Sequence, residues 1–195
     1  MRKKNEKLAI RWARDRMQED FVIVDTETNG WGDGFVSEVI QIGIVSKSGE
    51  VLLDALVRPT ENVVQQQATD IHGLQADDLK GAPSFTALWP SIAEILQAHE
   101  CTIAYNAAFD RQRLLDDVKR LGLPGEALEP KWRCAMLAYA HYHGDWNGYH
   151  KNWKWKKLDV AVKAFGIDIP RESHDATLDA RLTLEVVKAL AAVED

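Results

Sequence analysis

The feature that most constrains this chain is a run of four apolar residues that ends in two acids. The run, from Phe21 to Val24, leads directly into Asp25 and Glu27. Four apolar residues in succession predict a strand that is buried on both faces. Because Asp25 and Glu27 are two positions apart, their side chains point to the same face of an extended chain. We expect both carboxylates at the carboxyl end of this strand, where open α/β sheets bind ligands. Solvated acids at an exposed strand end are the alternative that the pair alone leaves open.

The rest of the chain shows strands first and mostly helices afterwards. Further strands are predicted over residues 36–46, 50–57 and 102–105, with a hairpin turn at residues 47–49. Helices are predicted over residues 66–79 in pieces, 84–97, 109–121, 134–142, 158–165 and 176–193. A meander of strands followed by alternating strands and helices predicts an α/β sandwich around a mixed sheet that is flanked by helices.

The N-terminal segment, residues 1–20, is predicted to be an accessory helix. Its pattern is amphipathic and places Leu8, Trp12 and Met17 on the inward face. We expect this helix to pack onto a single main domain that comprises residues 21–195.

Two further acids fall on the apolar faces of predicted helices. Asp110 shares a stripe with Leu114 and Val118 at the helical period, and Asp179 shares one with Val186 and other apolar residues. A carboxylate on a core-facing stripe loses solvation, and an unpaired buried charge is costly. The arginines within three positions of these acids mostly point to other sides of the helices. Another cation or donor is therefore expected near each acid.

Four carboxylates that converge on one place require a counter-charge. They would repel one another by about 4 kcal/mol per pair at a separation of about 4 Å and an effective dielectric constant near 20. Divalent cations would offset this repulsion. Because the expected ligands are oxygens, without a cysteine or histidine cluster, Mg²⁺ or Mn²⁺ is expected rather than Zn²⁺.

His174 precedes Asp179 by five positions, which corresponds to about 140° around a helix. The two side chains would not share a helical face, so His174 is expected just before the last helix begins, on a segment that can reach over the metals. A neutral imidazole suits a general base at physiological pH. A capping or surface histidine is the alternative.

Three ordered motifs carry a resemblance to a known family. The first is Asp25-Thr26-Glu27-Thr28-Asn29-Gly30, the second runs from Tyr105 to Asp110, and the third is His174-x-Ala176-x-x-Asp179. They resemble the DnaQ-like exonucleases of the RNase H-like fold, in the DEDDh subgroup that has a histidine base. The resemblance covers about residues 21–190. One such motif would be a weak signal, whereas three in order form a strong one.

The resemblance implies a metal-dependent 3′-to-5′ exonuclease that releases nucleoside 5′-monophosphates from nucleic-acid 3′ ends. It implies a three-layer sandwich with a five-stranded mixed β-sheet, and two bound ions, Mg²⁺ or Mn²⁺. Asp25 would bridge both ions, and Glu27 and Asp179 would hold the ion on the nucleophile side. Asp110 would support the second ion through water, and His174 would take the proton from the attacking water. The 3′-to-5′ polarity comes from the family alone.

Residues in and beside these motifs are candidates for substrate binding. His72, after the third strand, is expected beside the terminal nucleotide, and a packed histidine is the equal alternative. Trp31 stands where family members more often carry a smaller apolar residue. Its indole either stacks on a terminal base, an interaction of about 1 to 3 kcal/mol, or is a buried anchor of the following loop. The motifs themselves add Thr26, Thr28, Asn106 and Phe109.

The stretch of residues 150–157 is the clearest local positive patch. Interleaved cations and aromatic rings suit a single strand, with Lys154 and Lys157 on phosphates and indoles under bases. The alternative is a loop with one or two tryptophans in the core and lysines in solvent. Trp155, which lies nearest the next helix, is predicted to be a core residue.

Net charge limits how the chain can bind nucleic acid. With 24 basic and 30 acidic residues, the net charge of −6 excludes the broad basic footprint of a protein that coats duplex DNA. Contact with substrate must be local, as for an enzyme that holds one strand end. Single-stranded DNA is the preferred substrate, and RNA is left open because the discriminating contacts to a 2′-hydroxyl cannot be predicted from sequence.

The remaining features concern compartment and partners. The two cysteines, Cys101 and Cys134, lack CxxC spacing, and the N-terminal region has no apolar signal segment, so a cytoplasmic protein with reduced thiols and no membrane contact is expected. A polymerase partner and a homodimer are both left open. The alternatives to the preferred function are an RNA-trimming exoribonuclease, a proofreading subunit, and a non-catalytic nucleic-acid-binding module.

Overall fold

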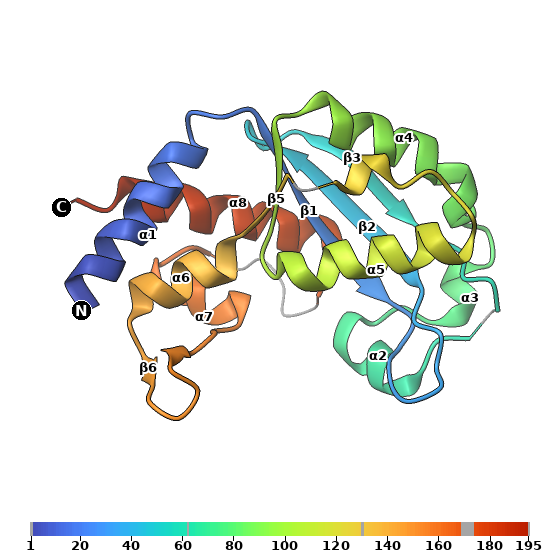
Figure 1. Cartoon of the computed structure of the whole chain (residues 1–195). Helices are drawn as coiled ribbons and strands as arrows, with labels where there is room; N and C mark the ends of the chain where they lie inside the picture. The colour runs from blue at the N-terminus through green and yellow to red at the C-terminus, as the bar shows by residue number, and fades with distance from the viewer. Residues whose placement is uncertain (1, 62, 130, 169–173, 195) are drawn as a thin grey trace.

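A five-stranded mixed sheet forms the middle of the molecule (Figure 1). The computed structural model describes residues 2–61, 63–129, 131–168 and 174–194. The strands of the sheet are β1 (Phe21–Thr28), β2 (Val39–Ser46), β3 (Val51–Leu56), β4 (Cys101–Ala104) and β5 (Trp132–Cys134). Their spatial order is β3-β2-β1-β4-β5. β1 pairs antiparallel with β2 and parallel with β4, which places the buried apolar run at the centre of the sheet.

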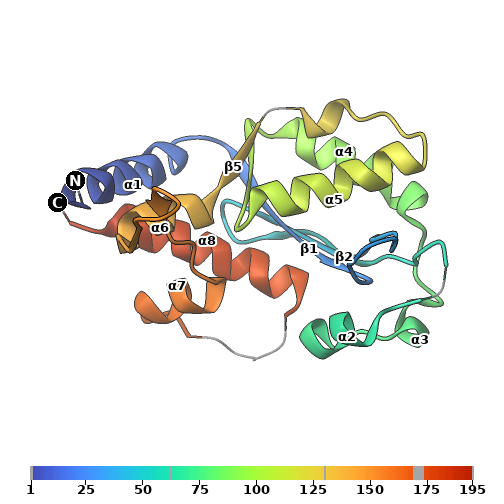
Figure 2. The ribbon, with the colours of Figure 1, turned by 60° about the horizontal axis from the view of Figure 1, so that its bottom comes forward.

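Helices cover both faces of the sheet, so the molecule has three layers (Figure 2). In the described residues, α4 (Phe85–Ala98) and α5 (Ala107–Arg120) lie on one face, and α6 (Ala135–His143), α7 (Leu158–Ala164) and α8 (Ala176–Ala192) on the other. The remaining helices are α1 (Arg2–Arg16), α2 (Gln66–His72), α3 (Ala76–Leu79) and the 3-10 helix η1 (Glu126–Leu128). No helix in these ranges is both long and apolar enough to cross a membrane. The predicted fold class is confirmed.

Side-chain alternation along β1 determines which layer each residue contacts. Phe21 and Ile23 pack in the cluster formed with α6, α7 and α8, whereas Val22 and Val24 pack in the cluster formed with α4 and α5. Both faces are therefore buried, as the apolar run predicts. The same alternation directs the acids that follow toward α8, and directs Thr26 toward α5.

Helix α1 packs against α6 and α8 through a different face from the predicted one. Ala9, Ile10 and Ala13 are buried, and Trp12 is partly buried. Leu8 is 49% exposed, so its predicted inward orientation is wrong. Two alanines on the contact face allow α1 to approach its neighbours closely, and this packing selects a stripe that begins one residue after Leu8. The division into an accessory helix and a main domain stays a prediction.

A short hairpin between α6 and α7 was not predicted. Its strands are β6 (Trp146–Asn147) and β7 (Asn152–Trp153), which pair antiparallel. The indole of Trp153 packs edge-on against that of Trp146, with ring centroids 4.9 Å apart, and Trp153 is buried. Trp155 is 62% exposed, so its predicted core position is wrong. The strand pairing buries Trp153 instead, and the chain leaves the strand before Trp155.

Candidate active site

The carboxyl half of β1 supplies the first two acids of the site. Asp25 and Glu27 are both partly buried, and they lie opposite Gly43 and Gln41 of β2 in the strand register. The pairing shifts by one residue after Glu27, so the acids occupy the last regular positions of the ladder. Both acids point toward the layer that contains α8.

Asp110 reaches the same strand from the opposite layer. It lies in the first turn of α5 and is 3% exposed. One of its oxygens, Oδ1, accepts hydrogen bonds from the backbone nitrogen of Thr26 at 3.0 Å and from the Thr26 hydroxyl at 2.8 Å. The core-facing stripe of this helix predicted the burial of Asp110. Thr26, a predicted substrate contact, is itself buried and binds Asp110 through its hydroxyl.

Asp179 and His174 come from the start of α8. Asp179 lies in the first turn, and His174 lies before the helix, as predicted. The imidazole Nδ1 of His174 is 3.3 Å from Asp179 Oδ2. Ligand atoms of Glu27, His174 and Asp179 all lie within 4.8 Å of one another. The structure thus brings β1 and α8 together at one small group of donors, with His174 as its exposed member.

Gln41 fixes the start of α8 to the sheet, a role that the sequence did not reveal. Its side-chain nitrogen donates to Asp175 Oδ2 at 2.9 Å, and its side-chain oxygen accepts from the backbone nitrogen of Ala176 at 3.3 Å. The other oxygen of Asp175 caps the helix by accepting from the Leu178 nitrogen at 2.9 Å. Asp175, the partner of Gln41, lies 134 positions further along the chain, so no local sequence pattern indicates this bond.

Gly43 allows α8 to approach the sheet closely. A Cβ atom built on Gly43 would lie 2.5 Å from the backbone nitrogen of Thr177 and 2.6 Å from the backbone carbonyl of Ala176. Contacts this short are not tolerated between backbone and side chain, so only glycine fits. Because Gly43 lies opposite Asp25, the missing side chain sets the spacing between β1 and the first turn of α8.

Burial and mutual repulsion raise the pKa values of three carboxyl groups of the site, those of Asp25, Glu27 and Asp110. Burial raises the pKa of Glu27 to about 8, and the charges of Asp179 and Asp110 add to this effect, while His174 opposes it. Burial also raises the pKa of Asp110 to about 7, against the lowering effect of its hydrogen bonds with Thr26. The pKa of Asp25 is raised well above its ordinary value by burial and then by Asp110 and Asp179. The four acids therefore interact electrostatically as a single group.

The neighbouring carboxylates raise the pKa of His174. Its hydrogen bond with Asp179 is the main cause, and the charges of Asp179 and Glu27 also favour the protonated ring, while burial and Lys157 oppose it. Lys157, whose charge opposes protonation of the ring, is the N-cap residue of α7.

The donor set fits a hard divalent cation. Four carboxylates converge, and no lysine or arginine in the described ranges lies within ion-pair distance of any of them. Oxygen ligands and one imidazole match Mg²⁺ or Mn²⁺ better than a thiophilic ion. A bound cation would provide the counter-charge that the chain does not supply.

His72 is packed rather than free. It is 7% exposed, and its Nε2 lies 3.2 Å from the carbonyl oxygen of Thr28, while its Nδ1 accepts from the backbone nitrogen of Leu74 at 3.1 Å. These bonds fix the Nε2-protonated tautomer, and burial lowers the pKa of the ring. The structure favours the packed alternative, in which His72 holds the end of β1 in place. Thr28 is likewise buried.

Trp31 and Phe109 present aromatic surface to solvent. Trp31 is 48% exposed, and its backbone nitrogen donates to Gln65 Oε1 at 2.9 Å, so the loop is held while the indole projects. The alternative of a buried anchor is wrong for Trp31. Phe109, one residue before Asp110, is 43% exposed and lies 5.7 Å below the guanidinium of Arg113. Asn106 is partly buried at the N-cap of the same helix.

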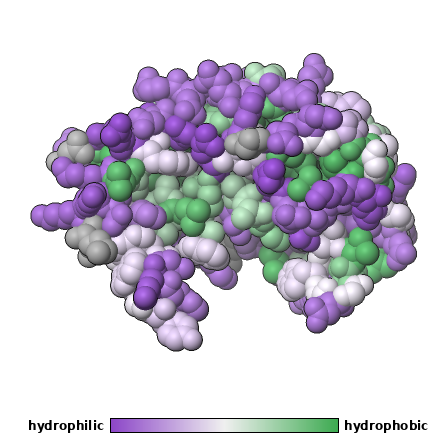
Figure 3. Space-filling view, in the orientation of Figure 1, coloured by the Kyte–Doolittle hydropathy of each residue, from purple (hydrophilic) through white to green (hydrophobic). Residues whose placement is uncertain are grey.

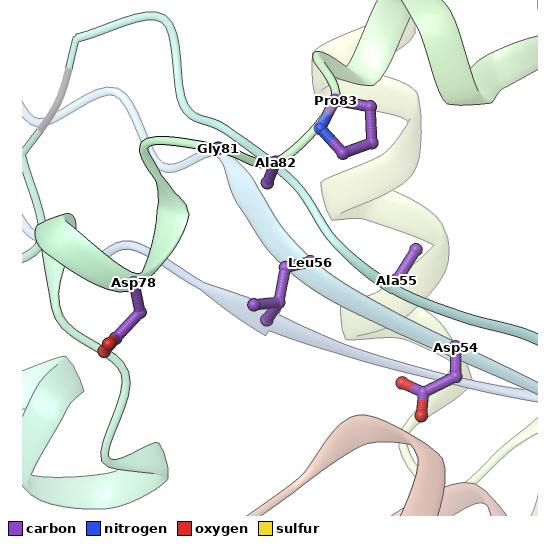
Figure 4. Close-up of a pocket in the computed structure, with 7 residues that line it drawn as sticks. All are labelled: Asp54, Ala55, Leu56, Asp78, Gly81, Ala82 and Pro83. Carbon is purple, nitrogen blue, oxygen red and sulfur yellow. The ribbon is translucent and has the colours of Figure 1, made fainter.

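A hollow on the surface lies away from these residues. It has a volume of about 500 Å³ and lies between β3 and the segment that joins α3 to α4. Figure 4 shows Asp54 and Asp78 at opposite ends of it, with Leu56 between them. None of the predicted catalytic residues lines this hollow, so the cluster of carboxylates, and not this hollow, defines the site.

Comparison with known proteins shows the family and the fold of the chain. Residues 22–187 match the family model described as an exonuclease, RNase_T. An uncharacterized exonuclease, CP81, of Escherichia phage 186 is 32% identical over 183 residues, which is 92% of each chain. The nuclease domain of 3'hExo, a DEDDh family member bound to rAMP, aligns with a TM-score of 0.67 at 16% identity over 87% of this chain and 90% of that one. The Mg²⁺- and Mn²⁺-bound form of S. pombe Pop2p aligns with a TM-score of 0.57 at 17% identity over 94% and 87%.

The fold and the family model place the chain in one class of enzyme, the exonucleases. This chain belongs to the RNase_T exonuclease family. The predictions of an exonuclease family, an RNase H-like fold and an exonuclease activity are confirmed.

Proposed function

We propose that the protein removes nucleotides one at a time from the 3′ end of single-stranded nucleic acid, with DNA as the first candidate substrate and RNA as the second. The observation that carries the proposal is the convergence of four carboxylates, three of them desolvated by burial, and one exposed imidazole at the carboxyl end of β1. No basic side chain of the described residues neutralises these acids, which is the arrangement that a two-metal phosphodiesterase requires.

The carboxylates of Asp25, Glu27, Asp110 and Asp179 would hold two divalent ions, Mg²⁺ or Mn²⁺. When bound, the ions would lower the pKa of water and offset the charge that develops on the phosphate. His174 takes the proton from the attacking water, and its exposure leaves it accessible from solvent. The new bond forms between the water oxygen and phosphorus, and the bond to the 3′ oxygen of the penultimate nucleotide breaks. That oxygen takes up a proton, and a nucleoside 5′-monophosphate is released.

Two exposed rings are proposed to hold the terminal nucleotide. Trp31 follows the end of β1, and Phe109 precedes Asp110, so both rings lie within a few residues of the acids. Stacking of an unpaired base on an exposed ring does not depend on sequence. Thr26, Thr28 and His72 support the acids and the backbone of β1 instead of contacting the base.

The test is a time course on 5′-labelled single-stranded DNA and RNA of the same sequence, with Mg²⁺, with Mn²⁺ and with EDTA. The wild type is expected to produce a metal-dependent ladder that shortens from the 3′ end. Asp179→Asn and His174→Ala should abolish the ladder, whereas His99→Ala, which changes a histidine bonded to the Ile95 carbonyl, should not. Faster shortening of RNA would reverse the order of the two substrates.

If the protein binds the strands normally but leaves them intact with every ion, the result would contradict this proposal and support a non-catalytic nucleic-acid-binding module. Cleavage at internal positions, or shortening from the 5′ end, would also contradict it.

A further inference from the structure

The hairpin between α6 and α7 projects from the body of the molecule as an arm (Figure 1). We define the arm as residues 145–157. Figure 3 shows it as a separate protrusion, with a recess between it and the lobe that contains α2. The family model spans this segment, but the catalytic acids and His174 all lie outside it.

The base of the arm is fixed to the body. The Tyr105 hydroxyl donates to the carbonyl oxygens of Lys156 at 2.8 Å and of Lys157 at 3.1 Å. Trp153 is buried and its ring lies near that of His141 on α6, with centroids 6.2 Å apart. The backbone nitrogen of Lys154 donates to the Asp145 carbonyl at 2.8 Å and closes the hairpin. These contacts make the arm a defined projection of the fold.

The surface of the arm combines exposed rings with uncompensated positive charge. Tyr149 is 90% exposed, Trp155 62% and Trp146 44%. Residues 146–157 contain four lysines and no acid, although the chain as a whole carries a net charge of −6. Asp145 binds Lys154 at 3.3 Å and Lys156 at 2.7 Å. Lys151 and Lys157 have no ion-pair partner in the described part of the chain.

The tip holds Lys151 in a conformation that a lysine rarely adopts. Its φ is +52°, and it is the one non-glycine residue with a positive φ among those described. Asn147 Oδ1 accepts from the backbone nitrogens of Tyr149 at 3.1 Å and of His150 at 3.2 Å, which fixes the turn. Glycine would occupy this position without strain, so the lysine side chain brings no local conformational benefit.

We propose that the arm binds the single strand on the 5′ side of the cleaved end, with phosphates on Lys151 and Lys157 and unpaired bases on Tyr149 and Trp155. The proposal rests on the proposed function, because it adds a second contact to the same strand. Positive charge next to exposed rings is complementary to a single strand, whose bases are free to stack. The carbonyl of Lys157 accepts from the Tyr105 hydroxyl, and Tyr105 directly precedes the N-cap of α5, the helix that carries Asp110, so this bond connects the base of the arm to the site.

The test separates strand holding from chemistry. The p-nitrophenyl ester of thymidine 5′-monophosphate occupies only the terminal position, whereas a strand of about 20 nucleotides also reaches the arm. Lys151→Gly combined with Tyr149→Ala and Trp155→Ala should raise KM for the strand about 10- to 100-fold and leave hydrolysis of the ester unchanged. Lys119→Ala, at the other end of α5 from Asp110, is the charge-matched control and should change neither.

Salt dependence gives a second readout. Each phosphate contact that is lost should reduce the slope of log K against log salt by about 0.7. Fluorescence anisotropy with a labelled strand in EDTA measures this slope without catalysis, so it tests the arm even if the proposed function fails. Because glycine relieves the strain at position 151, Lys151→Gly alone should weaken strand binding without lowering the melting temperature.

Three results would overturn the proposal. The first is unchanged strand affinity and salt slope in the triple variant. The second is an equal loss on the ester and the strand, which would indicate a damaged site. The third is a wild-type dimer that becomes monomeric in the triple variant with unchanged strand affinity, which would assign the arm to a second copy of the chain.

Discussion

Helix α5 buries two aspartates two turns apart, and their charges are balanced in different ways. Asp117, 1% exposed, accepts from Arg120 at 2.6 Å and from the backbone nitrogen of Val39 at 2.9 Å. Asp110, 3% exposed, accepts from Thr26 and faces other carboxylates. Within the described ranges, no basic side chain forms an ion pair with Asp110. One helix thus contains an acid with its own counter-ion and an acid without one.

The difference separates a structural carboxylate from a functional one. Burial raises the pKa of both groups, but at Asp117 the hydrogen bond and charge of Arg120 oppose the shift. Arg120 also binds Glu38 at 2.9 Å, so this end of α5 holds the start of β2. At Asp110 the uncompensated charge is available to a cation from solution. A buried acid therefore indicates a ligand site only when the chain leaves it unpaired.

Replacing Asp110 should have the largest effect on activity. Asp110→Asn keeps the size of the side chain but removes a charge, and the loss of several kcal/mol of transition-state stabilisation corresponds to about a 1000-fold lower kcat/KM. The same change should raise the melting temperature in EDTA at pH 8, because the folded state no longer carries a buried charge. A variant that keeps its activity, or that melts at a lower temperature in EDTA, would show that Asp110 is a structural carboxylate like Asp117.

Replacing Asp117 should have the opposite pattern. Asp117→Asn removes one partner of a buried pair and should lower the free energy of unfolding by about 3 kcal/mol. Urea unfolding measures this loss, and kcat at a temperature below the melting transition should stay within a few-fold of wild type. A stable variant with no activity would show that the two ends of α5 do not have separate roles.

Cation binding should stabilise the protein in a pH-dependent way. The folded pKa values of Glu27, about 8, and Asp110, about 7, lie above their ordinary values, so their contribution to stability is present at acidic pH and is lost as the pH rises through those values. A divalent ion at 100 times its Kd would add about 2.7 kcal/mol. Thermal melts should therefore show a larger effect of Mn²⁺ at about pH 8 than at about pH 5.5. An equal effect at both values, or one that survives in Asp110→Asn, would contradict a shared site.

The smallest effect is expected at Thr26. Thr26→Val removes the hydroxyl that orients Asp110 but keeps the backbone hydrogen bond, and it should weaken metal affinity about 10-fold. Metal titration followed by activity measures the shift. Thr102→Val, on the neighbouring strand β4, is a matched buried threonine and should leave metal affinity unchanged. A loss of the same size in both variants would indicate a general packing effect.

The sequence predicted the parts of the site that depend on local periodicity. The unbroken apolar run predicted the central strand, the spacing of Asp25 and Glu27 predicted their common face, and the stripe that contains Asp110 predicted its burial. His174 could be placed before α8 because five positions do not fit one helical face. Each inference used only the geometry of one element.

The remaining features depend on contacts between distant segments. Gln41 bonds to Asp175 across 134 positions of sequence, and Asp117 bonds to Val39 across 78, so no local pattern indicates either pair. Trp155 was assigned to the core because it lies nearest α7. Instead, the pairing of Trp146 with Trp153 buries Trp153 and leaves Trp155 exposed. A strand of two residues is too short to show a pattern from which this pairing could be predicted.

The glycine at position 43 shows that the chemical groups alone do not decide whether such a site works. Gly43→Ala would keep all four acids and His174 in the sequence. Its methyl group, however, would have to displace the backbone of α8, which carries Asp179. A shift of about 1 Å is enough to reduce a catalytic rate about 100-fold. A related chain that has every catalytic residue but a larger residue at this position would therefore be about 100-fold slower. Its catalytic residues alone would not reveal this loss.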